Sequence, residues 1–162
     1  MSGTLRQFCV VMIAWAAAAL FSGCPIDPGI DVENPAGVVL GRAAGAFVPG
    51  QEFSITVTIS AEDGASISAL GLTETVPEGW TFVAADGANG ARPVITPGEG
   101  DTGELGFLWV AVPEFPVSFT YTLLVPEDAA ATIEITGRVD YHQALGLLSS
   151  DDTVSSFSRD VP

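Results

Sequence analysis

The chain has 162 residues and a formal net charge of −15, with 20 acidic residues against five basic ones. Such a surface repels polyanions, which argues against nucleic acid as a partner. Hydrophobic residues make up 48% of the chain, which excludes a disordered acidic tail and fits one folded domain with appendages.

The N-terminal segment has the pattern of an export signal. Arg6 precedes an uncharged apolar run over residues 8–21, FCVVMIAWAAAALF. This run suits the helical core of a signal peptide and falls short of the roughly 20 residues of a membrane-spanning helix. We therefore predict a signal peptide over residues 1–23.

The sequence LFSGC at the end of this run resembles the bacterial lipobox. Ser22, Gly23 and Cys24 match the motif, whereas Phe21 stands where leucine is commonest. The resemblance implies cleavage between Gly23 and Cys24, with acyl chains such as palmitate on the Cys24 sulfur. An ordinary cleaved signal peptide and an uncleaved membrane anchor are the alternatives.

Cysteine usage agrees with lipidation. Cys9, the one other cysteine, would leave with the signal peptide, so Cys24 would have no disulfide partner. The expected location is the cell envelope, facing the periplasm or the cell surface. Pro25 follows the cysteine in place of the aspartate that resembles an inner-membrane retention signal, which favours the outer membrane where one exists.

Residues 24–37 are rich in proline, glycine and acidic residues and show no periodicity. This composition is typical of a semi-extended tether. A domain then follows over residues 38–162. Its segments alternate apolar and polar residues with period two, and turn signals such as VPGQ, AEDGAS and VPEGW separate them. The candidate strands are 37–47, 52–60, 67–76, 80–84, 104–110, 117–125, 132–141 and 153–157.

No helical period is readable after the signal peptide, so the fold class is all-β. We predict an immunoglobulin-like antiparallel β-sandwich of about seven or eight strands. Every second residue of each strand should face the core. In the strand over 80–84, this places Trp80, Phe82 and Ala84 inside.

Several motifs resemble immunoglobulin-like, cohesin-like modules of exported bacterial proteins. They are the Val76-Pro77-x-Gly79-Trp80 corner, Trp109, the run Thr120-Tyr121-x-Leu123 with Pro126, and Gly137 with Tyr141. The resemblance implies a non-catalytic module that binds an envelope protein or a polysaccharide, or that has a structural role.

Candidate catalytic groups are few. His142 is the one histidine, and no Gly-x-Ser-x-Gly elbow accompanies it. Glu74 and Glu78 flank the corner, and a carboxylate-dependent extracytoplasmic hydrolase is the alternative function. Glu74 lies in phase with the apolar face, so its pKa should be raised unless Arg42 or Arg138 pairs with it. We assign no catalytic residue and expect the protein not to be an enzyme.

Calcium is the one candidate cofactor. Glu99, Asp101 and Glu104 supply carboxylates on a loop, and Ca²⁺ is bound by six to eight oxygens. Their spacing matches no calcium loop, and a solvated acidic loop is the simpler interpretation. A calcium-stabilised adhesion domain therefore stands as a further alternative. Zinc is excluded by a lone histidine and an acylated cysteine.

Aromatic residues could bind a sugar or a protein if they were exposed. Trp80, Trp109 and Tyr121 fall on the inward phase of their strands, which predicts core packing. Phe115 lies in a turn between a glutamate and a proline. It is the predicted ligand-contact residue.

Overall fold

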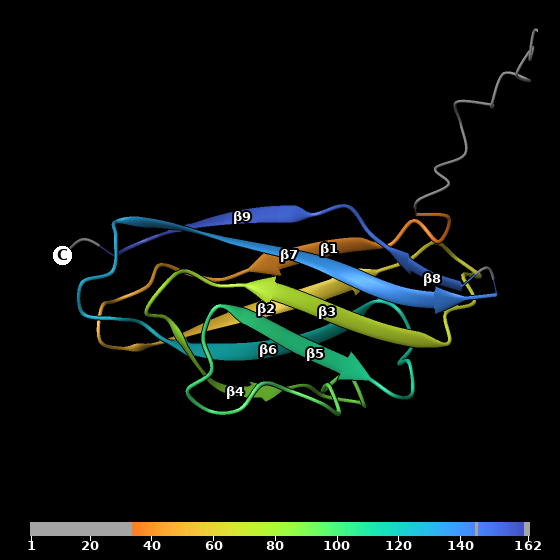
Figure 1. The fold of residues 1–162 in the computed structure, drawn as a ribbon, viewed down its shortest axis with the longest axis horizontal. Helices are drawn as coiled ribbons and strands as arrows, with labels where there is room; N and C mark the ends of the chain where they lie inside the picture. The colour runs from red at the N-terminus through yellow and green to blue at the C-terminus, as the bar shows by residue number, and fades with distance from the viewer. Residues whose placement is uncertain (1–33, 145, 161–162) are drawn as a thin grey trace, which may run out of the picture.

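The protein is an all-β sandwich of two antiparallel sheets. The computed structural model describes residues 34–144 and 146–160, which form nine strands and no helix (Figure 1). Gly23, Cys24 and the predicted signal-peptide helix lie outside the described residues. Within the described residues, no helix has the length and apolar character needed to cross a bilayer.

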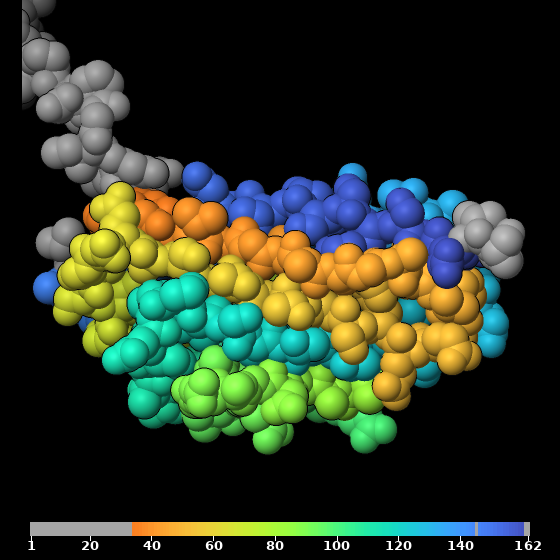
Figure 2. Space-filling model, turned by 180° about the vertical axis from the view of Figure 1, so that it is seen from behind, coloured from red at the N-terminus to blue at the C-terminus, as the bar shows by residue number. Residues whose placement is uncertain are grey.

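The first sheet has the strand order β1-β2-β6-β4, with every neighbouring pair antiparallel. Its strands are β1 (Val39–Ala43), β2 (Glu52–Ser60), β6 (Val117–Leu124) and β4 (Thr81–Asp86). Figure 2 shows the outer side of this sheet as successive bands, from β1 in orange through β6 in teal to β4 in green.

The second sheet has the strand order β5-β3-β7-β8, and β9 also pairs with β7. Its strands are β5 (Glu104–Trp109), β3 (Ala69–Thr75), β7 (Thr132–Gln143), β8 (Gly146–Ser149) and β9 (Thr153–Ser158). Because β7 is long, β9 pairs with its first half and β8 with its last residues. Figure 1 looks onto the outer side of this sheet.

The core lies between the sheets and is built by alternation, as predicted. In β2, for example, Phe53, Ile55 and Val57 are buried, whereas Ser54 and Thr56 between them are exposed. Aromatic rings fill much of the interior in edge-to-face contacts, which such rings prefer. The largest fully buried side chains include Trp80, Trp109, Tyr121, Tyr141, Phe47, Phe107 and Phe119. The prediction of core packing for Trp80, Trp109 and Tyr121 is therefore confirmed.

The corner before β4 takes its shape from its glycine. Gly79 has a φ of 83°, a left-handed conformation that glycine adopts without steric cost. The Trp80 backbone N–H closes the turn by donating to the Pro77 carbonyl at 3.2 Å. This turn delivers the Trp80 ring into the core, where its centroid lies 5.0 Å from that of Phe47.

Two details depart from the sequence prediction. The pairing of β4 with β6 shifts register between Phe82 and Ala84, so Ala84 is exposed and Ala85 is buried in its place. The bulge breaks the strict period on which the prediction of an inward Ala84 rested. Strand β8 was not predicted at all, since four residues are too few for a readable alternation.

The chain is already packed against the domain at Asn34, which lies inside the segment predicted to be the tether. Ala36 is 2% exposed, and the Asn34 side chain accepts from the Val38 N–H at 2.8 Å and donates to the Val38 carbonyl at 2.9 Å. The Tyr141 hydroxyl also donates to Asn34 Oδ1 at 2.9 Å. These bonds fix the chain entry against the end of β7.

Candidate functional site

The outer side of the β5-β3-β7-β8 sheet carries unusually small side chains at its centre. The register places Gly71 of β3 between Leu108 of β5 and Asp140 of β7. One row further along, Ala69 lies opposite His142, which in turn pairs with Leu147 of β8. Glycine and alanine thus form a low floor with larger side chains on both sides.

This arrangement produces an apolar hollow of about 350 Å³ on the outer side of the sheet. Leu147 is 73% exposed, Ile95 53% and Leu108 39%, so aliphatic carbon faces water around the floor. A contiguous exposed apolar patch on a soluble domain marks an interaction site more often than a lone exposed leucine does. The hollow is lined by Ala69, Leu70, Gly71, Leu72, Thr73, Ile95, Gly106, Phe107, Leu108, Asp140, Tyr141, His142 and Leu147.

Three distant segments of the chain converge on the hollow. Ile95 is held there by a β-bridge, in which the Leu108 N–H donates to the Ile95 carbonyl at 3.0 Å and the Ile95 N–H donates back at 3.2 Å. Leu147 reaches the other side because the short β7–β8 hairpin sets it opposite His142. The aliphatic rim is therefore fixed by backbone hydrogen bonds.

Internal packing does not require glycine at either glycine position of the floor. A Cβ added at Gly106 would meet no atom within 4 Å, and one added at Gly71 would make only ordinary contacts of 3.6 Å or more. Neither residue has a left-handed φ. Their lack of side chains lowers the surface without serving the core.

A second, polar hollow of about 170 Å³ adjoins the apolar one. Thr73 lines both, so the two hollows lie next to each other along β3. Arg138 contributes to the polar hollow and pairs with Asp140 at 3.2 Å. The remaining lining residues are Thr75, Glu104, Thr136, Gly137 and Asp152.

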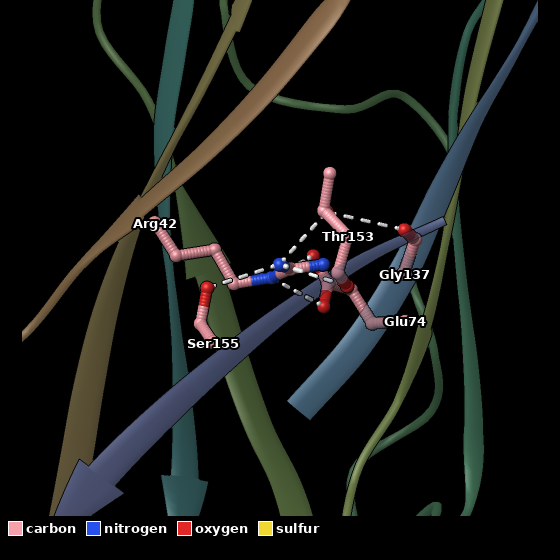
Figure 3. Close-up of polar contacts among 5 residues, drawn as sticks. All are labelled: Arg42, Glu74, Gly137, Thr153 and Ser155. Carbon is pink, nitrogen blue, oxygen red and sulfur yellow. Dashed lines mark hydrogen bonds and ion pairs between the residues drawn. The ribbon is translucent and has the colours of Figure 1, made fainter. Parts of the chain in front are cut away.

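A buried ion pair lies on the inner side of the same sheet (Figure 3). Arg42 extends from β1 of the opposite sheet, and its Nε donates to Glu74 Oε2 at 2.9 Å and to Oε1 at 3.1 Å. Both side chains are 0% exposed. Arg42 Nη1 also donates to the Thr153 hydroxyl at 3.1 Å and the Ser155 hydroxyl at 3.2 Å. One guanidinium thus connects β1, β3 and β9 across the two sheets.

Burial controls the titration of this cluster. Loss of hydration raises the pKa of Glu74 to about 7, although the charge and hydrogen bonds of Arg42 act in the opposite direction. Burial, and then the Glu74 charge, raise the pKa of Tyr121 well above its ordinary value. The prediction that Glu74 faces inward is confirmed, and its partner is Arg42, whereas Arg138 pairs with Asp140. Pairing was expected to prevent a raised pKa, but the effect of burial outweighs it.

The structure does not bring the candidate catalytic groups together. Glu74 is enclosed with Arg42, so it cannot share a cleft with the exposed Glu78 and Asp101. His142 Nδ1 lies 3.2 Å from the Ser68 hydroxyl, and the same hydroxyl donates to the His142 backbone carbonyl. A hydroxyl committed to a carbonyl on an open surface lacks the geometry of an activated nucleophile.

The acidic residues weighed for calcium are placed separately. Asp101 Oδ2 accepts from the Gly98 N–H at 2.7 Å and so closes its own turn. Glu104 lines the polar hollow, and Glu99 is exposed on the loop. Over residues 34–144 and 146–160, no three His, Cys, Asp or Glu side chains gather as metal ligands.

Phe115 is half-buried and packs against the core. It lines a different hollow of about 440 Å³, together with Glu62, Asp63 and Glu114. The structure therefore does not bring the predicted contact residue to the apolar hollow. Gly23 and Cys24, the predicted cleavage and lipidation residues, lie outside the described part of the chain.

Sequence reasoning missed the aliphatic rim of the hollow. Leu108 did carry a signal, because it is a leucine in the outward phase between the inward Phe107 and Trp109. Leu147 belongs to the strand that was too short to predict. Ile95 reaches β5 through an isolated bridge, which no periodicity reveals.

No protein-family model and no curated protein matches the sequence. Among solved structures, one similar protein is the sixth cohesin of Acetivibrio cellulolyticus scaffoldin B, in complex with a Cel5 dockerin mutant. Its TM-score is 0.60 at 15% sequence identity, and the match covers 76% of this chain and 99% of that one. The cohesin module of a Clostridium perfringens family 33 glycoside hydrolase gives 0.58 at 9% identity, covering 77% and 96%.

A non-cellulosomal cohesin from the archaeon Archaeoglobus fulgidus gives a TM-score of 0.53 at 10% identity, covering 78% of this chain and 93% of that one. At such low identity, these likenesses establish the fold alone. The domain is a cohesin-like β-sandwich.

Proposed function

We propose that the protein is a non-catalytic, lipid-anchored module of the cell envelope that binds a partner protein on the outer side of the β5-β3-β7-β8 sheet, called the docking face below. The observation that carries this proposal is the apolar hollow of about 350 Å³, with its low floor and its exposed aliphatic rim. The Cys24 anchor would hold the module at the membrane, and the segment before Asn34 would serve as its tether.

A protein partner is favoured over a polysaccharide by the chemistry of the hollow. Sugar sites generally present exposed aromatic faces, and the aromatic residues lining this hollow, Phe107 and Tyr141, are only 2% and 1% exposed. What the hollow offers is aliphatic carbon, which suits the apolar side chains of a protein. Two of the similar cohesin structures, from Acetivibrio cellulolyticus scaffoldins, contain a dockerin as partner.

The dimensions of the face suit a helix. Across the strands, Leu108 on β5 and Leu147 on β8 are three strand spacings apart, or about 14 Å, and they are offset by two residues along the strands. An α-helix with its side chains is about 10–12 Å across, so it fits between these two leucines. We infer that the partner docks a helix along the strands, over Ala69 and Gly71.

Site-specific photo-crosslinking tests the docking face in the native host. A photoreactive phenylalanine derivative at position 106 should form a discrete adduct, because Gly106 lines the hollow and has free space above it. The same derivative at position 56, on the exposed side of the other sheet, is the control and should form none. Partner identity would follow from mass spectrometry of the adduct.

A second variant separates docking from chance proximity. Gly71→Trp fills the hollow from a position where a Cβ makes only ordinary contacts, so the fold should persist while the position-106 adduct disappears. Thr56→Trp should leave the adduct intact. An adduct that survives Gly71→Trp, or that forms equally from position 56, would refute docking at this face.

The anchor has its own test. Cys24→Ser should move the exported protein from the membrane fraction to the soluble fraction without changing its thermal unfolding. Mass spectrometry of the mature N-terminus should find acyl chains on Cys24 in the wild type. Membrane fractionation that persists in Cys24→Ser after signal removal would rule out lipid anchoring.

A further inference from the structure

We infer that the segment docking on this face is cationic, with a lysine or arginine placed over the polar hollow beside the aliphatic contact. This inference rests on the proposed function, because it specifies the partner of the same face. It follows from which charges of the polar hollow are already paired and which are not.

The polar hollow carries two carboxylates that are free to receive a cation. Glu104 and Asp152 both line it, and both are exposed. Within residues 34–144 and 146–160, neither takes part in an ion pair. Arg138, the one cation of the hollow, is already engaged with Asp140 at 3.2 Å. The unpaired charge of the hollow is therefore negative.

The floor of the polar hollow adds hydrogen-bond acceptors without adding opposing charge. Thr73, Thr75 and Thr136 also line this hollow, and Thr75 lies opposite Glu104 in the sheet. An ammonium or guanidinium group donates several hydrogen bonds and accepts none, so hydroxyls and carboxylates suit it together. An anionic group placed there would face Glu104 and Asp152 at close range.

The charge of the whole molecule acts in the same direction. With a net charge of −15, the surface attracts a cationic partner and repels an anionic one. Electrostatic complementarity of this kind raises association rates and excludes wrong partners more than it adds affinity. A positively charged helix with an apolar stripe is thus the occupant that both hollows accept.

The spacing of the two hollows sets the spacing within the partner. Leu108 and Glu104 are four residues apart on β5, which corresponds to about 13 Å along the strand. In a helix running along the strands, this distance corresponds to roughly eight or nine residues at 1.5 Å per residue. The cation should therefore lie about two turns from the aliphatic side chain.

A displayed library of random peptides, selected on the immobilised full-length protein, supplies the probe. Peptides that also bind the Gly71→Trp variant are removed, so that those remaining depend on the hollow. They should be enriched in lysine or arginine about two helical turns from a leucine, isoleucine or valine. Hollow-dependent peptides without this enrichment would overturn the inference and leave docking at the face intact.

The affinity of one selected peptide then locates the cation. Glu104→Gln combined with Asp152→Asn should weaken binding by about tenfold at low salt, and less at high salt. Glu52→Gln combined with Glu78→Gln is the matched control, since it removes the same net charge from exposed positions that line neither hollow. Equal affinity in the two double variants would refute the inference. If no selected peptide is sensitive to Gly71→Trp, docking at the face fails and the inference fails with it.

Discussion

The two sides of the β5-β3-β7-β8 sheet differ in how much space they leave. On the inner side, a Cβ added at Gly137 would clash with the Arg42 guanidinium and would come within 2.8 Å of the Thr73 carbonyl and 3.0 Å of Glu74 Oε2. On the outer side, a Cβ added at Gly106 would meet nothing within 4 Å. Both glycines occupy ordinary strand positions in the same sheet.

The contrast shows that the two strand glycines have different structural roles. Gly137 makes room for a buried ion pair, so the fold requires it. Gly106 leaves a space that nothing in the described residues occupies, and in our proposal a partner fills it. Strand glycines generally lower stability, so an unfilled one is more readily understood as a binding feature.

The largest effect should come from breaking the inner side. Arg42→Ala leaves Glu74 buried without its cation and removes the hydrogen bonds to Thr153 and Ser155. Loss of one partner of a buried pair costs about 3–5 kcal/mol, which urea denaturation monitored by tryptophan fluorescence would measure.

Arg138→Ala is the matched control for this variant. Arg138 pairs with Asp140 on the outer side, where the two side chains are 49% and 30% exposed. Exposed pairs contribute about 0–1 kcal/mol, so the free energy of unfolding should change little. Similar losses of unfolding free energy in both variants would mean that the inner and outer ion pairs contribute equally to stability.

A smaller effect should appear in the pH dependence of stability. The pKa of Glu74 is raised from 4.5 to about 7 in the folded protein, so between these values the folded state retains a proton that the unfolded state has released. The free energy of unfolding should therefore fall as the pH rises from 4.5 to 7, by up to about 3 kcal/mol from this group.

Glu74→Gln isolates this contribution from the repulsion among the other acidic groups. Glutamine has a similar size and does not titrate, so the difference in unfolding free energy between wild type and Glu74→Gln should decline across the same pH window. Chemical denaturation at several pH values measures it. A difference that stays constant from pH 4.5 to 7 would show that Glu74 keeps its ordinary titration.

The sequence predicted the inner side of the sheets well. Alternation placed Leu70, Leu72 and Glu74 on one face, because period two determines which residues share a side. It did not decide between Arg42 and Arg138, the two partners considered for the glutamate. It failed at β4, where the bulge moves Ala85 into the position expected for Ala84. A bulge changes the register by one residue, and no residue type in this segment indicates that a bulge is present.

The outer side was much less predictable. Polar and small residues in the outward phase look alike whether they contact water or a partner, and the hollow arises from segments brought together only by folding. Ile95 and Leu147 are separated by most of the second half of the chain, yet both line it. Pairwise proximity of this kind depends on strand order, which one sequence does not reveal.

The smallest expected effects compare the two glycines directly. Gly137→Ala should lower the free energy of unfolding by about 1–3 kcal/mol, because the new methyl group displaces the Arg42–Glu74 pair or the Thr73 backbone. Gly106→Ala should instead raise it by roughly 0.4–1 kcal/mol, since alanine reduces the entropy of the unfolded chain and fits without strain. Opposite signs in parallel urea titrations would establish that the inner glycine serves the fold and the outer one does not. A loss of stability in Gly106→Ala would instead mean that the open floor is itself part of the packing, and that its low surface needs no partner to explain it.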